Sequence, residues 1–236
     1  MTEADEVARV TAAWERIEQW LSKHTALTRS MLRPPADERA IRSVEEEIGV
    51  AFPPGLRALY LTHDGINAAG HYADYPHDVV PPDPADPYWA HENASCFLPG
   101  GFGWLPLGEA VALAGAAVFP ESGPRIPFLA DLTDAGMYGM WVAADGRLGT
   151  WGDAMPPQKL GFTLADYLTS AADALDGDGP AIGREGLKDA RPFISPTGDG
   201  LRWLDLDAPE IIADYKGDGW RPARPAAVQG PHSSGG

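Results

Sequence analysis

The sequence predicts an α+β fold in which N-terminal helices pack on a mostly antiparallel sheet. Apolar residues recur every three or four positions through the first part of the chain, as they do in amphipathic helices. Two strand-like runs follow, at 126–132 and 138–143, with short turns around them. A last amphipathic helix, over 163–175, closes this part. We therefore expect residues 1–176 to form one domain and residues 177–236 to form a Gly/Pro-rich extension that is partly docked on it.

Three helices are expected in the N-terminal part, near 6–22, 36–48 and 54–62. The second has acidic residues in its first turn, where negative charge suits the helix dipole, and Gly49 at its end. The third begins at a Pro-Pro pair and ends at Gly65, which we expect to have a positive φ just past the helix end. The helices are expected to pack together and bury these apolar positions: Trp14, Ile17, Leu21, Ile41, Val44, Leu56 and Leu59.

The rest of the chain has weaker structural signals. Residues 66–124 contain many Gly, Pro and aromatic residues with little helical period, so we expect loops and short strands there. The Asp145-Gly146 pair is a hairpin signal, and 148–151 is the expected returning strand. The last helix begins with the spacing of a capping box. In the extension, apolar and aromatic residues can pack on the domain, and a loose tail is expected from about Pro222.

The composition is strongly acidic. The formal net charge is −16 and the isoelectric point is near 4.6. Such a charge disfavours binding to nucleic acid and to an anionic membrane surface, because both are negatively charged. It favours attraction to a basic protein partner. Acidity that serves solubility alone is the alternative, and composition does not exclude it.

Cysteine usage and hydropathy bear on the compartment. Cys96 is the only cysteine, so the chain has no internal disulfide and no thiolate-rich zinc site. We expect Cys96 to be a small buried hydrophobe. The N-terminal residues lack a basic region followed by an apolar run, so no signal peptide is expected. No apolar run approaches the roughly 20 residues that span a bilayer, and we expect a cytoplasmic protein.

The order of these elements resembles the SUKH superfamily, which includes the Smi/Knr-type cell-wall assembly regulators. The resemblance covers roughly residues 10–176 and includes the segments FPPGLRALYLTHDG, FLADLTDAGMYGMWV and FTLADYL. Most of it lies between residues 32 and 65, at Ile41, Glu45, Gly49, Pro53, Leu56, Leu59, Asp64 and Gly65. The resemblance implies an α+β fold and, for bacterial members, immunity proteins that bind and neutralise toxins. It transfers no catalytic motif, and the long 66–124 stretch and the C-terminal extension depart from a minimal member.

The charge pattern in the middle of the chain indicates a binding surface. No Lys or Arg occurs between Arg57 and Arg125, a stretch that contains eight carboxylates. Carboxylates steer a basic partner, and rigid aromatic rings supply binding hot spots. We call residues 66–95 the acidic segment and expect it to form a partner-binding face, although a solvated acidic loop is the alternative. The expected binding residues are Asp64, Tyr72, Asp74, Tyr75, Asp78, Asp83, Asp86, Tyr88, Trp89 and Glu92.

Metal and catalytic sites are not expected. One group of residues has ligand chemistry but not the spacing of a metal site: His63, His71, Asp74, His77, Asp78 and His91. The Asp/Gly-rich runs at 131–136 and 176–179 lack the pattern of an EF-hand, so we expect turns. The chain has no nucleophile-elbow, P-loop, dinucleotide-binding or metalloprotease motif. We therefore expect no metal, no cofactor and no enzymatic activity.

Three functional hypotheses remain. The first is an immunity-type protein that binds a basic protein toxin, such as a nuclease or deaminase, and neutralises it. The alternative is a regulatory or scaffold protein that binds endogenous partners, as cell-wall assembly regulators do. A hydrolase built on the His/Asp-rich loop is the third, and it lacks an assembled acid–base pair. The sequence leaves open the identity of the partner, the oligomeric state and the role of the extension.

Overall fold

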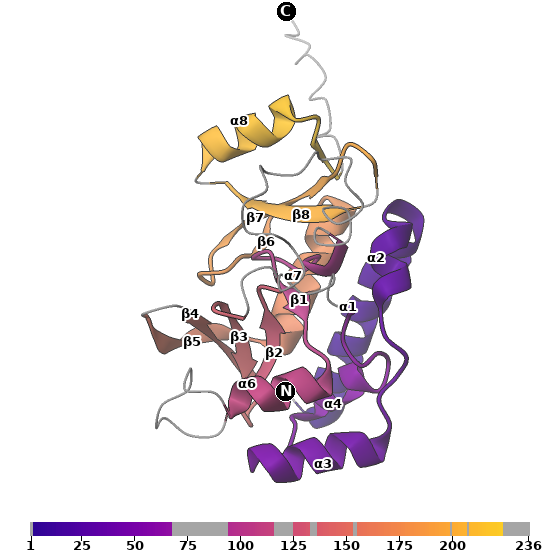
Figure 1. Cartoon of the computed structure of the whole chain (residues 1–236), viewed down its shortest axis with the longest axis vertical. Coiled ribbons are helices and arrows are strands. Elements are labelled where there is room, and N and C mark those ends of the chain that lie inside the picture. Colours follow the sequence, from indigo (N-terminus) through magenta and orange to yellow (C-terminus); the bar gives the residue numbers. More distant parts are fainter. Residues whose placement is uncertain are drawn as a thin grey trace, which may run out of the picture.

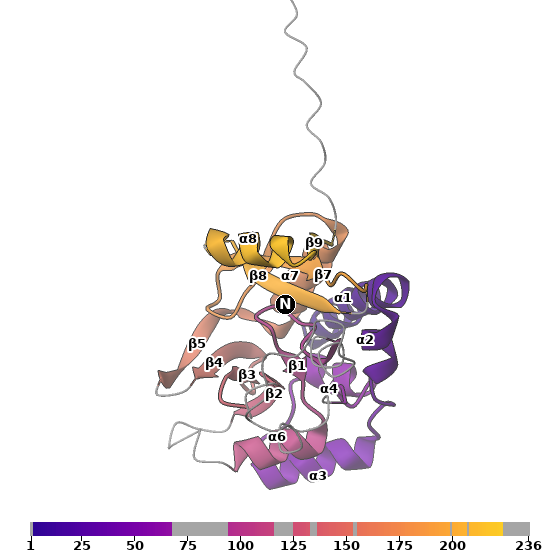
Figure 2. The same cartoon turned by 45° about the horizontal axis from the view of Figure 1, so that its top comes forward.

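A computed structural model describes residues 2–67, 94–115, 125–132, 136–152, 155–198, 200–206 and 208–223. The expected α+β class is confirmed, with helices and two antiparallel sheets. Figures 1 and 2 place the first sheet, with α3 and α6, at one end of the molecule and the second sheet, with α8, at the other. Helices α1 and α7 run between these ends.

The N-terminal part contains the three expected helices and one short additional helix. Their bounds are α1 Glu3–His24, α2 Ala26–Met31, α3 Glu38–Ile48 and α4 Pro54–Tyr60. Helix α1 begins with a capping box, in which Thr2 accepts from the Asp5 amide and Asp5 accepts from the Thr2 amide. Helix α3 ends at Gly49, whose φ of 78° is left-handed. All seven apolar side chains expected to be buried in these helices are buried, which confirms the core prediction.

The first sheet has the strand order β1-β2-β3-β4-β5, and every pair is antiparallel. Its strands are β1 Gly103–Trp104, β2 Ile126–Ala130, β3 Gly139–Val142, β4 Arg147–Gly152 and β5 Met155–Thr163. The hairpin at Asp145-Gly146 confirms the sequence prediction, because β3 and β4 pair across it. Part of the turn between β2 and β3, residues 133–135, lies outside the described residues.

Two positions in β3 and β4 require glycine because an indole ring lies against the backbone at each of them. A Cβ at Gly149 would lie 2.0 Å from the Trp141 ring, and one at Gly139 would lie 2.2 Å from the Trp151 ring. The indole N–H of Trp151 donates to the Gly136 carbonyl at 3.0 Å. Both rings therefore lie against strand backbone that has no side chain, and both are buried.

Helix α6, Leu107–Ala114, lies in a stretch where loops and short strands were expected, so that expectation was wrong for these residues. The helix packs on α3 and on β2. Its start follows Pro106, which suits a helix N-terminus because its fixed φ and missing N–H cost nothing there.

Helix α7, Leu164–Asp176, closes the domain as expected and has a full capping box from Thr163 and Asp166. It packs along α1, and ion pairs join the two helices. Arg16 binds Asp173 at 2.9 Å and Asp176 at 2.6 Å, and Arg9 binds Asp166 at 2.8 Å. Although partial burial opposes ionisation of Asp166, hydrogen bonds from Thr163 and the Arg9 guanidinium hold its pKa below the usual value.

The C-terminal extension forms a second sheet and an exposed helix. The strands are β6 Ala181–Ile182, β7 Lys188–Ile194, β8 Leu201–Asp205 and β9 Arg221–Pro222, and α8 covers Pro209–Gly217. The hydroxyl of Ser170 in α7 accepts from the Ile182 amide at 3.1 Å. The indole N–H of Trp203 donates to the Phe97 carbonyl at 2.8 Å. The extension is therefore attached to the domain by buried hydrogen bonds.

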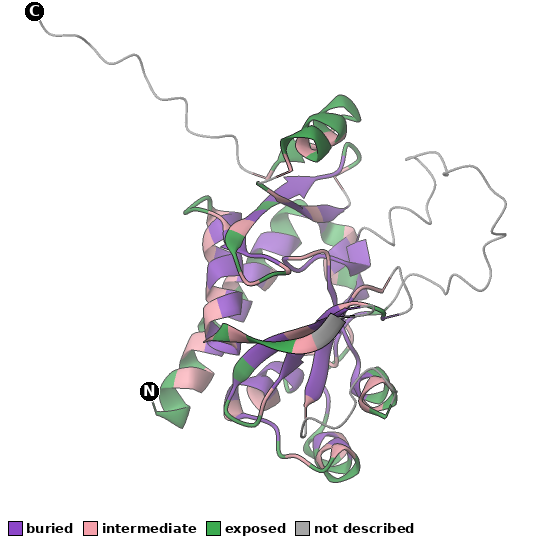
Figure 3. Cartoon of the chain, turned by 90° about the vertical axis from the view of Figure 1, so that its left-hand side faces the viewer, coloured by how far each residue is buried: buried purple, intermediate pink, exposed green. Residues whose placement is uncertain are grey.

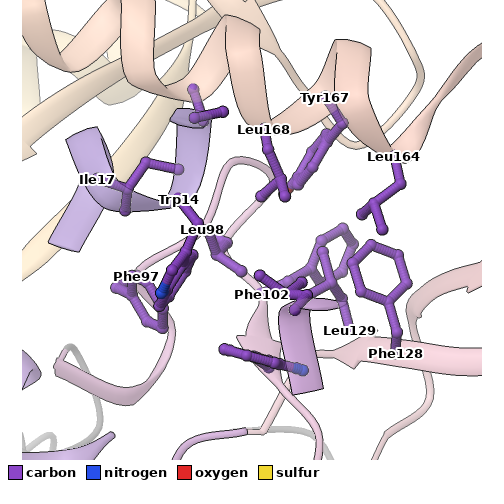
Figure 4. Packing of buried hydrophobic residues seen from close by; sticks show 14 of the residues in the cluster. Trp14, Ile17, Phe97, Leu98, Phe102, Phe128, Leu129, Leu164, Tyr167 and Leu168 are labelled. Atoms are coloured by element: carbon purple, nitrogen blue, oxygen red, sulfur yellow. The ribbon is translucent and has the colours of Figure 1, made fainter. Parts of the chain in front are cut away.

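The core lies between the two long helices and the first sheet (Figure 3). Figure 4 shows Trp14 and Ile17 of α1, Tyr167 and Leu168 of α7, and Phe128 of β2 converging on one another. The Trp14 ring lies edge-on to the rings of Trp104 and Phe97, with centroids 5.0 Å and 6.3 Å away. No helix within the described ranges is long and apolar enough to cross a bilayer.

Candidate partner-binding surface

Nine of the ten expected binding residues lie outside the described residues: Tyr72, Asp74, Tyr75, Asp78, Asp83, Asp86, Tyr88, Trp89 and Glu92. Their role stays a prediction from the sequence. The tenth, Asp64, lies just after α4 and can be examined in detail.

Asp64 joins three parts of the chain. Its side chain is only 20% exposed. One carboxylate oxygen pairs with the Arg33 guanidinium, 3.2 Å from Nη2, and the other accepts from the Leu107 amide at 2.9 Å. Because Leu107 is the first residue of α6, the carboxylate satisfies a free N–H at the positive end of that helix. Both oxygens of Asp64 therefore have partners within the chain.

The described residues at the two ends of the acidic segment are anchored in the core. Gly65 has a φ of 74°, which confirms the expected conformation. The Ile66 amide donates to the Trp104 carbonyl at 2.9 Å, and the Asn67 amide donates to the Met31 carbonyl at 2.9 Å. At the other end, Ala94 is fully buried. Fixed, buried backbone thus holds both ends of the acidic segment, which is how binding loops are commonly presented.

Seven of the thirteen arginines that the structure describes pair with carboxylates of the body. The pairs are Arg9–Asp166, Arg16–Asp173 and Asp176, Arg29–Glu18, Arg33–Asp64, Arg57–Glu38 and Glu45, Arg147–Asp145, and Arg184–Asp131. Between residues 68 and 93, by contrast, the sequence has five carboxylates and no Lys or Arg. The acidic segment therefore contributes negative charge without any cation of its own.

His63, the one described member of the histidine group, has structural partners. Its Nδ1 lies 2.6 Å from the Arg33 carbonyl, and its Nε2 lies 3.4 Å from Glu18. The ring also contacts Trp14 edge-on. The described residues contain no group of three or more His, Cys, Asp or Glu side chains that could hold a metal ion, and the other members of the group lie outside them.

Cys96 is buried, as expected. Burial raises the pKa of its thiol to about 11, so the thiol form predominates at neutral pH.

One cleft was not predicted from the sequence. Two hollows of about 410 and 280 Å³ adjoin each other and share Arg184 as a wall. The larger is lined from the first sheet by Tyr138 and Trp151, and the smaller from the second sheet and α8 by Arg202 and Tyr215. We call the two together the inter-sheet cleft. No short motif marks it, because its residues come from distant segments and meet only in the fold.

Comparison with known proteins gives a partial likeness. No family model matches the chain. A stretch of 61 residues, 26% of the chain, is 33% identical to the cell wall assembly regulator SMI1 of Saccharomyces cerevisiae and covers 12% of that protein. A KNR4/SMI1 homolog of Eremothecium gossypii is 33% identical over 61 residues, 9% of its length. The chain thus matches about a tenth of these relatives, and about a quarter of it is similar to cell wall assembly regulators of the SMI1/KNR4 type.

Proposed function

We propose that this chain is an immunity-type binding protein that neutralises a basic protein toxin, such as a nuclease or a deaminase, by binding it directly in the cytoplasm. The carrying observation is the run from Arg57 to Arg125, which has eight carboxylates and no internal Lys or Arg. Its central part, the acidic segment, begins and ends in buried backbone.

Physical chemistry links this arrangement to a basic partner. Carboxylates that crowd together repel one another in the free protein, and a cationic surface relieves that repulsion on binding. The same charges accelerate encounter with a basic protein. The interleaved Tyr and Trp side chains supply large rigid contact areas at small entropic cost, as hot spots do. Such a surface suits the occlusion of a cationic active site.

The ion pairs of the described residues suggest different roles for Asp64 and for the carboxylates of the acidic segment. Arg33, which donates to Asn67 at the base of the acidic segment, is already paired with Asp64. That pair also fixes the start of α6 through the Leu107 amide. We therefore assign Asp64 the task of holding the base of the segment, while the carboxylates of residues 68–93 meet the partner.

The test is a capture experiment with a charge-matched control. The wild-type chain is immobilised and exposed to extract of its native cell, and bound proteins are identified by mass spectrometry. The segment variant carries Asp→Asn at Asp74, Asp78, Asp83 and Asp86 with Glu92→Gln. The control variant carries Glu→Gln at five exposed glutamates of the body: Glu3, Glu15, Glu46, Glu47 and Glu210. Both variants have the same net charge, so only the position of the lost charge differs.

We expect a protein rich in Lys and Arg to bind the wild type and the control variant but not the segment variant. With that protein purified, the segment variant should show a slower association rate and a weaker salt dependence. Trp89→Ala should mainly speed dissociation and cost about 2 kcal/mol or more of binding free energy. Equal capture by the two variants would overturn the assignment of the acidic segment.

The likeness to cell wall assembly regulators favours a second candidate, a regulatory or scaffold protein that binds endogenous partners. Growth separates the two. The captured protein is expressed alone and together with the chain. Arrest of growth that co-expression relieves supports the immunity role, and a captured protein that is harmless when expressed alone supports the scaffold role. A neighbouring gene for a large secreted protein with a variable C-terminal domain would also favour immunity.

A further inference from the structure

One exposed apolar side chain lines the inter-sheet cleft, and three others lie within two positions of its wall residues along the sequence. These four, with Leu61, are the large apolar side chains that are exposed among the described residues. Ile211 of α8 lines the smaller hollow and is 46% exposed, and Leu187, two residues beyond Glu185 in the wall of the larger hollow, is 55% exposed. Met137 precedes the wall residue Tyr138, and Leu206 follows the wall residue Asp205. Exposed apolar side chains rimmed by polar groups are typical of protein-docking sites.

Helix α8 is unusual in having no buried residue. Its main packing contact is with β8. Figure 3 shows it as the mostly exposed helix at the top. Its Tyr215 ring contacts the Trp220 ring edge-on, at 5.4 Å between centroids, which fixes one side of the helix. Ile211 and Tyr215, one turn apart, both line the smaller hollow.

Arg184 is held rigidly but has donors left over. Its guanidinium lies between two rings, 5.1 Å from the centroid of Phe102 and 5.0 Å from that of Tyr138. Nη2 donates to the Gly100 carbonyl at 3.3 Å and lies 3.5 Å from an Asp131 oxygen. Among the described residues, Nε and Nη1 have no hydrogen-bond partner, and the side chain is 40% exposed.

Arg202, which also lines the smaller hollow, is held by an aromatic ring in the same way as Arg184. Its guanidinium lies 5.6 Å from the ring centroid of Tyr215, and Nη1 donates to the Tyr215 hydroxyl. No further hydrogen bond of this guanidinium is found within the described ranges. Two stacked, partly exposed arginines thus line one hollow with N–H groups to spare, the arrangement that binds a carboxylate in a forked geometry.

The smaller hollow also contains two carboxylates, Asp131 and Asp205, which balance the charge of the two arginines. Asp131 pairs with Arg184 and has a further interaction, and Asp205 also has an interaction of its own. The binding capacity of these walls therefore lies in the arginine N–H donors and in the exposed side chain of Ile211, rather than in a net positive charge.

We propose that the inter-sheet cleft is a second docking site, which takes an extended segment of a protein partner carrying a large apolar side chain and a carboxylate. The apolar side chain packs against Ile211, and the carboxylate accepts from Arg184 and Arg202. This site rests on the proposed function only in that the partner is a protein. The acidic segment attracts a basic partner by charge. The cleft adds contacts that other cationic proteins cannot make, so the cleft supplies specificity.

The experiment selects short random peptides on phage against the intact chain. Enriched peptides are synthesised, and their affinity is measured by fluorescence polarisation for the wild type and for Ile211→Ser and Arg202→Gln. Leu61→Ser is the matched control, since Leu61 is an exposed large apolar side chain that does not line the cleft. The segment variant described above is included to separate this site from the acidic segment.

We expect the enriched peptides to share an apolar residue and an Asp or Glu. Ile211→Ser and Arg202→Gln should each weaken binding about tenfold, the loss of one hot-spot contact, whereas Leu61→Ser and the segment variant leave it unchanged. Replacing the peptide carboxylate by its amide should weaken binding to the wild type more than binding to Arg202→Gln, which shows that the two groups interact. Arg202→Lys, which keeps the charge but not the fork, replaces Arg202→Gln if that variant unfolds.

Three results would overturn the cleft proposal: no enrichment, equal binding by Ile211→Ser and the wild type, or enrichment of basic peptides that the segment variant no longer binds. The last would place peptide binding on the acidic segment instead. A failure of the immunity role, with a harmless captured protein, leaves the peptide result unaffected.

Discussion

Gly65→Ala tests how the base of the acidic segment is built. Gly65 has a φ of 74°, a conformation that costs a residue with a Cβ about 1–2 kcal/mol. A Cβ there would also lie 2.6 Å from the Leu105 carbonyl carbon and 2.6 Å from the Pro106 nitrogen. Both are backbone atoms that cannot rotate aside, so an overpacking cost of about 1–3 kcal/mol is added. We expect Gly65→Ala to lower the free energy of unfolding by about 2–5 kcal/mol, the sum of these two ranges.

The control is Gly49→Ala at the end of α3. Gly49 has nearly the same φ, 78°, but a Cβ there would meet no atom within 4 Å. It should therefore lose only the conformational part, about 1–2 kcal/mol. Urea denaturation followed by tryptophan fluorescence measures both variants, and the difference between them isolates the steric part. If Gly65→Ala costs no more than Gly49→Ala, the close approach to residues 105 and 106 does not restrict this position.

Two further predictions concern the body. Ile41→Ala should lower the free energy of unfolding by about 2–5 kcal/mol, because Ile41 is fully buried, while Arg39→Ala on the exposed face of the same helix should cost little. Burial, reinforced by Glu3 and opposed by Arg9, raises the pKa of Glu6, so ionised Glu6 destabilises the fold as pH rises above its ordinary value. Glu6→Gln should therefore raise the thermal midpoint at pH 7 and lose that advantage near pH 4; an equal gain at both pH values would contradict this reasoning.

The elements that the sequence predicts well are those with a local signal. Helix α3 has an apolar stripe, an acidic first turn with a cap at Asp37, and a terminal glycine, and all of these act within a few residues. The β3–β4 hairpin has an Asp-Gly turn between two apolar runs. In such cases propensity, pattern and turn chemistry agree, and the tertiary structure has nothing to override.

The missed elements depend on their neighbours. Strand β5 begins with the sequence Met-Pro-Pro, which argues against a strand, yet it forms the edge of the sheet, where a missing N–H is tolerated. Helix α6 has only eight residues, too few for a clear period, and is held by α3, β2 and the Asp64 carboxylate. In the second sheet, β6 and β9 have two residues each and exist only because β7 pairs with them.

The two candidate sites also differ in how much of them the sequence reveals. The charge of the acidic segment is a property of composition and is visible in the sequence. The pairing of Asp64 with Arg33, 31 positions earlier, is not visible, because it requires the turn after α4 to fold back on the α2–α3 connection. The inter-sheet cleft is more remote still, since Tyr138 and Arg184 meet only when the second sheet docks on the first.

The long partnership of α1 with α7 has a consequence for synthesis on the ribosome. About 140 residues separate the end of α1 from the start of α7. At about 5–20 residues per second, α1 waits roughly 7–30 s for the helix that covers it. During that time the face with Trp14, Ile17 and Leu21 has no native cover from α7, and it is the surface on which a nascent-chain chaperone would act. Chains that stop before Leu164 keep that face uncovered for good and should aggregate or be degraded rather than accumulate as smaller binding proteins.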